Sequence, residues 1–126
     1  MRHLLDTQAL LWWAADDPRL GQGAGELIAE GTPVVSSVLL WEIAIKVNIG
    51  KLTADVREIA AFVADQSMER LTIADGHIFR AQDLPLHHRD PFDRLLIAQA
   101  LEEDLPVLTA DAKLSAYGAT TLDAMQ

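Results

Sequence analysis

Short apolar segments alternate with helix-like segments along the whole chain, and this alternation is the feature that most restricts the fold. The apolar segments predict strands at residues 2–5, 33–36, 70–73, 106–109 and, as an edge strand, 120–122. The segments between them predict helices at residues 7–15, 23–30, 38–48, 55–67, 75–82 and from residue 91 onward. Strands that are separated by helices form parallel sheets through βα units. The sequence therefore predicts an α/β fold, a three-layer α/β/α domain with a central, mostly parallel sheet of about five strands.

Capping residues mark the ends of several predicted helices. Ser36 or Ser37 is available to cap the third helix, and Gly50 follows that helix as a stop signal. Asp90 and Pro91 predict the start of the last long helix, with Asp90 as its N-cap and Pro91 at its first position. Apolar residues spread around this last helix too widely for one stripe. We therefore expect it to be covered on more than one side.

The composition agrees with a single folded domain over residues 1–126. The chain has 10 Lys and Arg against 19 Asp and Glu, which gives a formal net charge of −9 and a pI near 4.7. This balance argues against a non-specific nucleic-acid binder, because such proteins carry a basic face. Cysteine is absent, which excludes disulfides, thiol nucleophiles and cysteine-based metal sites.

Neither a membrane span nor a signal peptide is expected. The longest unbroken apolar run, residues 9–15, is too short to cross a bilayer. The first residues of the chain lack the apolar core that a signal peptide needs. We therefore expect a cytoplasmic protein.

Four acidic residues are expected at one edge of the sheet. Asp6 directly follows the first strand, and Asp111 comes two residues after the fourth, so both lie at the carboxyl edge. Helices of βα units start at this edge, which places Asp93 there, in the first turn of its helix. Glu42 lies about one turn into the helix after the second strand, within side-chain reach of the same place. Ligands of open parallel sheets bind beyond this edge.

Carboxylates gathered in this way would repel one another unless a cation neutralised them. Mg²⁺ and Mn²⁺ prefer oxygen ligands and are commonly held by a few carboxylates together with substrate phosphates. Such an ion activates water and stabilises the leaving oxygen when a phosphodiester is cleaved. We therefore expect Mg²⁺ or Mn²⁺ at Asp6, Glu42, Asp93 and Asp111, so that the metal rather than a basic face meets the phosphate backbone.

Each of these acids also has an ordinary structural interpretation. Glu42 lies four residues before Lys46, a spacing that fits a surface ion pair worth about 0.2–0.5 kcal/mol. Asp93 is favoured by the positive end of its helix dipole, and Asp111 fits an ordinary turn and helix start. The convergence of the four, rather than any one of them, favours a site.

Four segments carry a family resemblance: residues 4–7 (LLDT), 41–46 (WEIAIK), 88–100 (HRDPFDRLLIAQA) and 108–111 (LTAD). In this order and at this spacing, they resemble the PIN-domain nucleases, and within them the VapC-type toxins of type II toxin–antitoxin pairs. The third segment is the most specific, and the resemblance covers essentially the whole chain.

This resemblance implies a PIN-like domain that acts as a metal-dependent endoribonuclease, a hydrolase of RNA phosphodiester bonds with Mg²⁺ or Mn²⁺ as cofactor. It implies a homodimer, and a small cognate antitoxin that blocks the active site. Promoter DNA would be bound only through the antitoxin, and no membrane partner is expected.

Carried over by position, Asp6, Glu42, Asp93 and Asp111 are the expected catalytic and metal-binding carboxylates. The Thr7 and Thr109 hydroxyls are the expected supporting groups, which orient waters or metal ligands. The family more often has Asn or Ser at the position of Gln8, so the supporting role of that position stays open. Asp90 is a fifth acid close to Asp93, and it competes with Asp93 for the role of the third acid.

Basic residues near these segments are candidates for binding the RNA backbone. We expect Lys46 and Arg94 to do so, with Lys51 and Arg89 as further candidates, although each also serves to balance nearby acids. His87 and His88 precede the last long helix, and we expect them to be exposed loop histidines rather than RNA contacts.

Two other functions stay open. The first is a catalytically silent interaction domain of the same fold, against which the presence of all four acids argues. The second and weaker is an aspartyl-phosphate hydrolase of haloacid-dehalogenase type. Such enzymes also place an Asp after the first strand, but they typically have a second acid two residues later, where this chain has Gln8.

Overall fold

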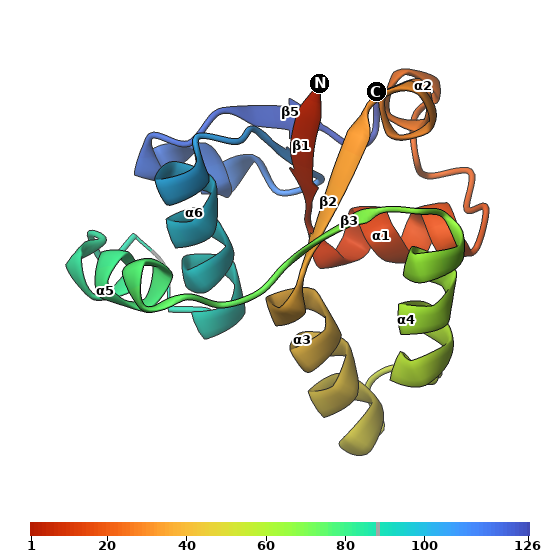
Figure 1. Cartoon of the computed structure of the whole chain (residues 1–126), viewed down its shortest axis with the longest axis horizontal. Coiled ribbons are helices and arrows are strands. Elements are labelled where there is room, and N and C mark those ends of the chain that lie inside the picture. The colour runs from red at the N-terminus through yellow and green to blue at the C-terminus, as the bar shows by residue number, and fades with distance from the viewer. Residues whose placement is uncertain (88) are drawn as a thin grey trace.

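A computed structural model describes residues 1–87 and 89–126 and shows five strands with helices around them (Figure 1). The strands are β1 (Arg2–Leu5), β2 (Thr32–Ser36), β3 (Glu69–Leu71), β4 (Val107–Thr109) and β5 (Thr121–Asp123). The helices are α1 (Thr7–Ala14), α2 (Gln22–Glu30), α3 (Ser37–Asn48), α4 (Val56–Asp65), α5 (Asp75–Asp83), α6 (Pro91–Glu103) and the 3₁₀ helix η1 (Ala112–Tyr117). The predicted elements are confirmed, with ends that differ by one or two residues. His87 is exposed, as expected, and His88 lies outside the described residues.

The sheet has the order β3-β2-β1-β4-β5, and every neighbouring pair is parallel. The chain runs outward from β1 to β3 and then returns across the sheet to β4. Right-handed crossovers therefore place helices on both faces. Figure 1 shows α1, α2 and α4 on one side of the strands and α5 and α6 on the other. The reversal falls between the adjacent strands β1 and β4, which is the topological switch point where open α/β sheets bind ligands.

The two central strands are buried on both faces. Leu4 and Leu5 of β1 have no exposed surface, and Val107 and Leu108 of β4 are at most 1% exposed. Helix α6 is buried along five consecutive residues, from Leu96 to Ala100. The prediction that this helix is covered on more than one side is thereby confirmed. No helix formed by the described residues has the length and hydrophobicity needed to span a bilayer.

Predicted caps fix where two helices of the carboxyl edge begin. Ser36 caps α3, and its hydroxyl accepts a hydrogen bond from the Val38 amide at 3.0 Å. Asp90 caps α6 by accepting from the Phe92 and Asp93 amides, with Pro91 at the first helical position. Gly50 has a φ of 78° just beyond α3, a backbone conformation that costs little only for glycine.

His3 is a fully buried imidazole on β1. Its Nδ1 donates a hydrogen bond to the Met1 carbonyl at 3.0 Å, so that Nε2 carries the lone pair. Nε2 is buried and has no hydrogen-bond partner among residues 1–87 and 89–126. Burial lowers the pKa of His3 from 6.5, and the hydrogen bond to Met1 only partly opposes this effect.

The lowered pKa of His3 predicts a loss of stability in acid. The unfolded chain takes up the proton first, so the free energy of unfolding falls as the pH drops below 6.5 through the pKa of the folded state. For one group the slope is at most about 1.4 kcal/mol per pH unit. Urea titrations between neutral and acidic pH should show this slope in the wild type and a smaller one in His3→Leu. Equal slopes in the two proteins would show that His3 is protonated in the folded state without penalty.

Candidate active site

Asp6 lies at the switch point, directly after β1. Its Oδ1 accepts a hydrogen bond from the Ala9 amide at 2.7 Å and so caps α1. Its Oδ2 accepts from the hydroxyl of Thr109, the last residue of β4, at 2.6 Å, and from the Ala110 amide at 3.4 Å. The backbone amide of Asp6 also donates to the carbonyl of Leu108. Two strands and a helix end therefore fix one carboxylate that is only 8% exposed.

Glu42 reaches the same place from α3. It is also only 8% exposed, and both of its carboxylate oxygens are engaged. Oε1 accepts a hydrogen bond from the Thr7 hydroxyl at 2.7 Å, and Oε2 lies 2.5 Å from Nζ of Lys46. The expected i,i+4 pair of Glu42 and Lys46 is thus formed, but its carboxylate is buried rather than on an open surface.

These side chains line one cleft with a volume of about 280 Å³. Its lining residues are Asp6, Thr7, Gln8, Leu11, Glu42, Lys46, Lys51, Leu52 and Asp93. Three of the four expected acids are therefore brought together, from the end of β1, the middle of α3 and the first turn of α6. Lys46 and Lys51 add positive charge to the same cleft.

Asp111 and Thr109 are not part of the lining of this cleft. Oγ1 of Thr109 donates to Asp6 and accepts from the Asp111 amide at 2.9 Å, so a chain of hydrogen bonds links Asp111 to the cleft. The Asp111 carboxylate caps η1 by accepting from the Lys113 amide at 2.9 Å. Thr109 therefore supports Asp6, whereas a metal-binding role for Asp111 stays a prediction.

Arg94 points to a different part of the surface. Its guanidinium donates to the carbonyls of Ala81, Leu84 and Pro85, at the end of α5 and just beyond it, at 2.9–3.2 Å. It lines a separate, mostly apolar groove together with Trp41. The structure does not bring Arg94 into the cleft with Asp6, and its expected role in RNA binding stays untested.

Burial sets the electrostatics of the cleft. The pKa of Asp6 is raised above its usual value mainly by desolvation, with a smaller contribution from the charge of Glu42. The hydrogen bonds from Thr109, Ala9 and Ala110 act in the opposite direction, because they stabilise the carboxylate. The pKa of Lys46 is raised, first by its hydrogen bond to Glu42 and then by the charges of Glu42, Asp90 and Asp93.

The donors of the cleft suit a hard divalent cation, since carboxylate and hydroxyl oxygens are the ligands that Mg²⁺ and Mn²⁺ prefer. Within the described part of the chain, however, no three His, Asp or Glu side chains are arranged to hold a metal ion as they stand. One physical reason is visible at Glu42, where Thr7 and Lys46 take both carboxylate oxygens. Metal binding at this cleft would therefore require side chains to move.

Comparison with known proteins places this geometry in a family. The PIN domain profile matches residues 3–119. The chain belongs to the PIN domain family. No protein with a curated description matches the sequence.

Solved structures show the same PIN fold over nearly the whole chain. VapBC2 from Rickettsia felis, bound to a DNA fragment from its promoter, is similar with a TM-score of 0.75 and 18% identity, covering 97% of this chain and 98% of that one. FitAcB from Neisseria gonorrhoeae is similar with a TM-score of 0.68 and 16% identity, covering 98% of each chain. A toxin–antitoxin complex from Klebsiella pneumoniae is similar with a TM-score of 0.63 and 16% identity, covering 97% of each chain.

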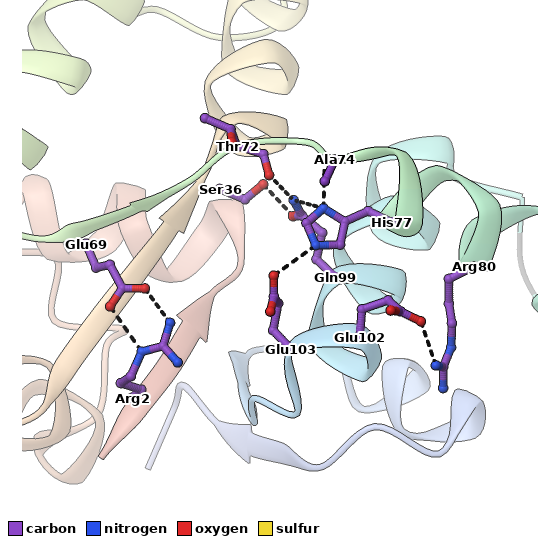
Figure 2. A network of polar contacts seen from close by, with 10 residues as sticks. All are labelled: Arg2, Ser36, Glu69, Thr72, Ala74, His77, Arg80, Gln99, Glu102 and Glu103. Carbon is purple, nitrogen blue, oxygen red and sulfur yellow. Dashed lines mark hydrogen bonds and ion pairs between the residues drawn. The ribbon is translucent and has the colours of Figure 1, made fainter.

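A buried polar network that the sequence did not predict joins α6, the helix that carries Asp93, to α5 and to the end of β2, whose last residue Ser36 caps α3 (Figure 2). Gln99 of α6 is fully buried; its Oε1 accepts from the Ser36 hydroxyl at 2.5 Å, and its Nε2 donates to the Thr72 carbonyl at 3.3 Å. His77 accepts from the Ala74 amide at Nδ1, and its Nε2 lies 3.1 Å from a Glu103 carboxylate oxygen. The one available signal was an amide side chain between Ala98 and Ala100 in an otherwise apolar run.

Replacing Asp6 separates its capping role from its charge. Asp6→Ala removes the cap of α1 and the acceptor of the Thr109 hydroxyl, and we expect it to lower the free energy of unfolding by about 0.5–2 kcal/mol or more. Asp6→Asn keeps an oxygen for the cap and removes a charge whose burial is unfavourable without metal, so its stability should lie at or above that of the wild type. Thermal and urea unfolding of the metal-free proteins measures both. Equal destabilisation by Asn and Ala would mean that the buried charge carries no penalty.

Replacing Gln99 tests whether the network holds α6 against Ser36, the last residue of β2 and the N-cap of α3. Gln99→Met has a similar volume but leaves the Ser36 hydroxyl and the Thr72 carbonyl without the amide, and we expect a loss of about 1–3 kcal/mol in unfolding free energy. Gln66→Met, at an exposed position just after α4, is the matched control and should change stability by less than about 0.5 kcal/mol. Urea denaturation of the three proteins gives the comparison. A Gln99→Met protein as stable as the control would show that packing alone fixes these helices.

Proposed function

We propose that this PIN domain is the toxin of a toxin–antitoxin pair, an endoribonuclease that uses Mg²⁺ or Mn²⁺ held by Asp6, Glu42, Asp93 and Asp111. The observation that carries the proposal is the meeting of three carboxylates, from three separate elements, in one cleft at the switch point of the sheet. A purely structural role does not require Asp6 and Glu42 to be desolvated beside each other. A divalent ion bound there activates water and neutralises charge on the phosphate.

The chain's own residues have distinct tasks in this proposal. Thr109 and the Ala9 amide hold the Asp6 carboxylate in a fixed orientation, and Thr7 does the same for Glu42. Lys46 and Lys51 supply positive charge on the lining of the cleft, where the RNA backbone would pass. Asp93 enters from the first turn of α6, whose N-terminus is favourable for an anion.

The proposed partners are a small inhibitory antitoxin, a second copy of this chain, and promoter DNA bound through the antitoxin. The similar structures from Rickettsia felis and Klebsiella pneumoniae are complexes with antitoxins or with promoter DNA, which supports the antitoxin and DNA. The chain also exposes large apolar side chains for protein contacts: Trp41 is 50%, Ile78 51% and Leu86 67% exposed, and all three line one groove.

Cleavage of a mixed RNA pool tests the proposal. We expect metal-dependent cleavage by the wild type, and a rate about 100-fold or more lower in Asp6→Asn and Asp93→Asn, because each removes a carboxylate that is proposed to hold the metal ion. Asp65→Asn is the matched control, since Asp65 is an exposed acid at the end of α4 and not part of the cleft lining. It should cleave as the wild type does.

The same assay separates the alternatives. Asp90→Asn keeps an N-cap of similar quality, so a large loss of activity in this variant together with full activity in Asp93→Asn would move the third-acid role to Asp90. No cleavage by the folded wild type, free of any partner and supplied with either metal, would favour the silent interaction domain.

A further inference from the structure

The ion pair of Lys46 and Glu42 lies inside the acidic cleft, at the place where a divalent cation is proposed to bind. Glu42 Oε2 is 2.5 Å from Lys46 Nζ, while Glu42 Oε1 is held by the Thr7 hydroxyl at 2.7 Å. A metal ion that binds Glu42 needs a carboxylate oxygen at close range, and an ammonium bonded to that oxygen repels a second cation. The two cations therefore compete for Glu42.

The two members of the pair differ in how firmly they are held. The Glu42 side chain is 10% exposed and is fixed by Thr7, whereas the Lys46 side chain is 44% exposed. Lysine carries its charge on a flexible four-carbon stem, with rotatable donors that fit many acceptors. Breaking the pair would therefore move Lys46 and leave Glu42 in place.

The charges around the cleft favour such a displacement. Asp6, Glu42 and Asp93 are opposed by Lys46 and Lys51, so the cleft carries a small formal excess of negative charge. A divalent cation reverses that sign and makes the cleft attractive to an anion.

We propose that Lys46 is an internal counter-cation, which holds the Glu42 carboxylate in the metal-free protein and is displaced from it when the divalent cation binds. This inference rests on the proposed metal-dependent function. It assigns the Lys46 side chain a second position, away from Glu42, in the metal-bound protein. Metal affinity is thereby weakened by the free energy of breaking the ion pair. The displaced ammonium then faces the cleft as a donor for a phosphate oxygen of the substrate.

Manganese binding to the purified, metal-free protein tests the proposal without measuring catalysis. Free Mn²⁺ is followed by electron paramagnetic resonance in wild type, Lys46→Gln and Lys51→Gln. Lys46→Gln should bind Mn²⁺ about tenfold more tightly than the wild type, which corresponds to ~1.4 kcal/mol. Lys51→Gln removes the same charge from the same cleft but not the bond to Glu42, so its affinity should rise less than about threefold.

A double-variant cycle locates the competition at Glu42. In a Glu42→Gln background, the further change Lys46→Gln should alter Mn²⁺ affinity no more than Lys51→Gln does, because the ion pair is already absent. Equal affinities of wild type and Lys46→Gln, or equal gains for Lys46→Gln and Lys51→Gln, would overturn the counter-cation role while leaving the metal site intact. Absence of Mn²⁺ binding in every protein would instead overturn the proposed metal-dependent function.

Acylation of lysine amines provides a second measurement, which uses the wild-type protein without any substitution. An ammonium held by a carboxylate reacts slowly, so the acylation rate of Lys46 relative to Lys51, read by mass spectrometry, should rise several-fold when Mn²⁺ is added. An unchanged ratio in protein that binds Mn²⁺ would show that Lys46 stays on Glu42 and would overturn the proposal.

Discussion

The hydrogen bond from the Thr109 hydroxyl to Asp6 joins the end of β4 to the residue that follows β1, the two strands between which the strand order reverses. The positions of the other side chains in the cleft depend on this hydrogen bond. The bond fixes the carboxylate that caps α1, and the first residue of α1 is Thr7, which in turn holds Glu42 on α3. Three elements from distant parts of the chain are thereby set around one buried negative charge. Because that charge is held away from water by strands that cannot shift independently, its position is preorganised for a ligand.

Local rules were sufficient to predict the elements and the edge at which the acids meet. The apolar runs at β1 and β4 and the caps Ser36 and Asp90 are signals that a few neighbouring residues determine. The edge of the sheet at which the acids lie follows from one further rule: in βα units, the carboxyl ends of the strands and the starts of the helices lie at the same edge. These rules are enough to predict that Asp6, Glu42 and Asp93 lie near one another.

The sequence did not predict the contacts between elements, because these contacts depend on how the elements pack. Arg94 is one turn after Asp90, the N-cap of α6, yet its side chain donates to the carbonyls of Ala81 and Pro85 at the end of α5, because α5 and α6 pack side by side. Asp111 caps η1, as the helix start that its sequence position also allowed, and its expected metal-binding role stays a prediction. Gln99 looks like an ordinary helix residue in the sequence, and only the approach of β2, the segment after β3 and α5 gives its amide three partners.

The acidic net charge of −9 and an RNA substrate are compatible only if charge is organised locally. Two of the chain's ten basic residues lie in the cleft beside the acids, so the field near the site differs in sign from the field of the whole surface once a divalent cation is present. Without the cation, the same acids repel a phosphate backbone, and Lys46 is engaged by Glu42. Under the proposed function, the metal-free protein is therefore poorly disposed to bind RNA at this cleft, and cation binding and substrate binding are coupled through the same few charges.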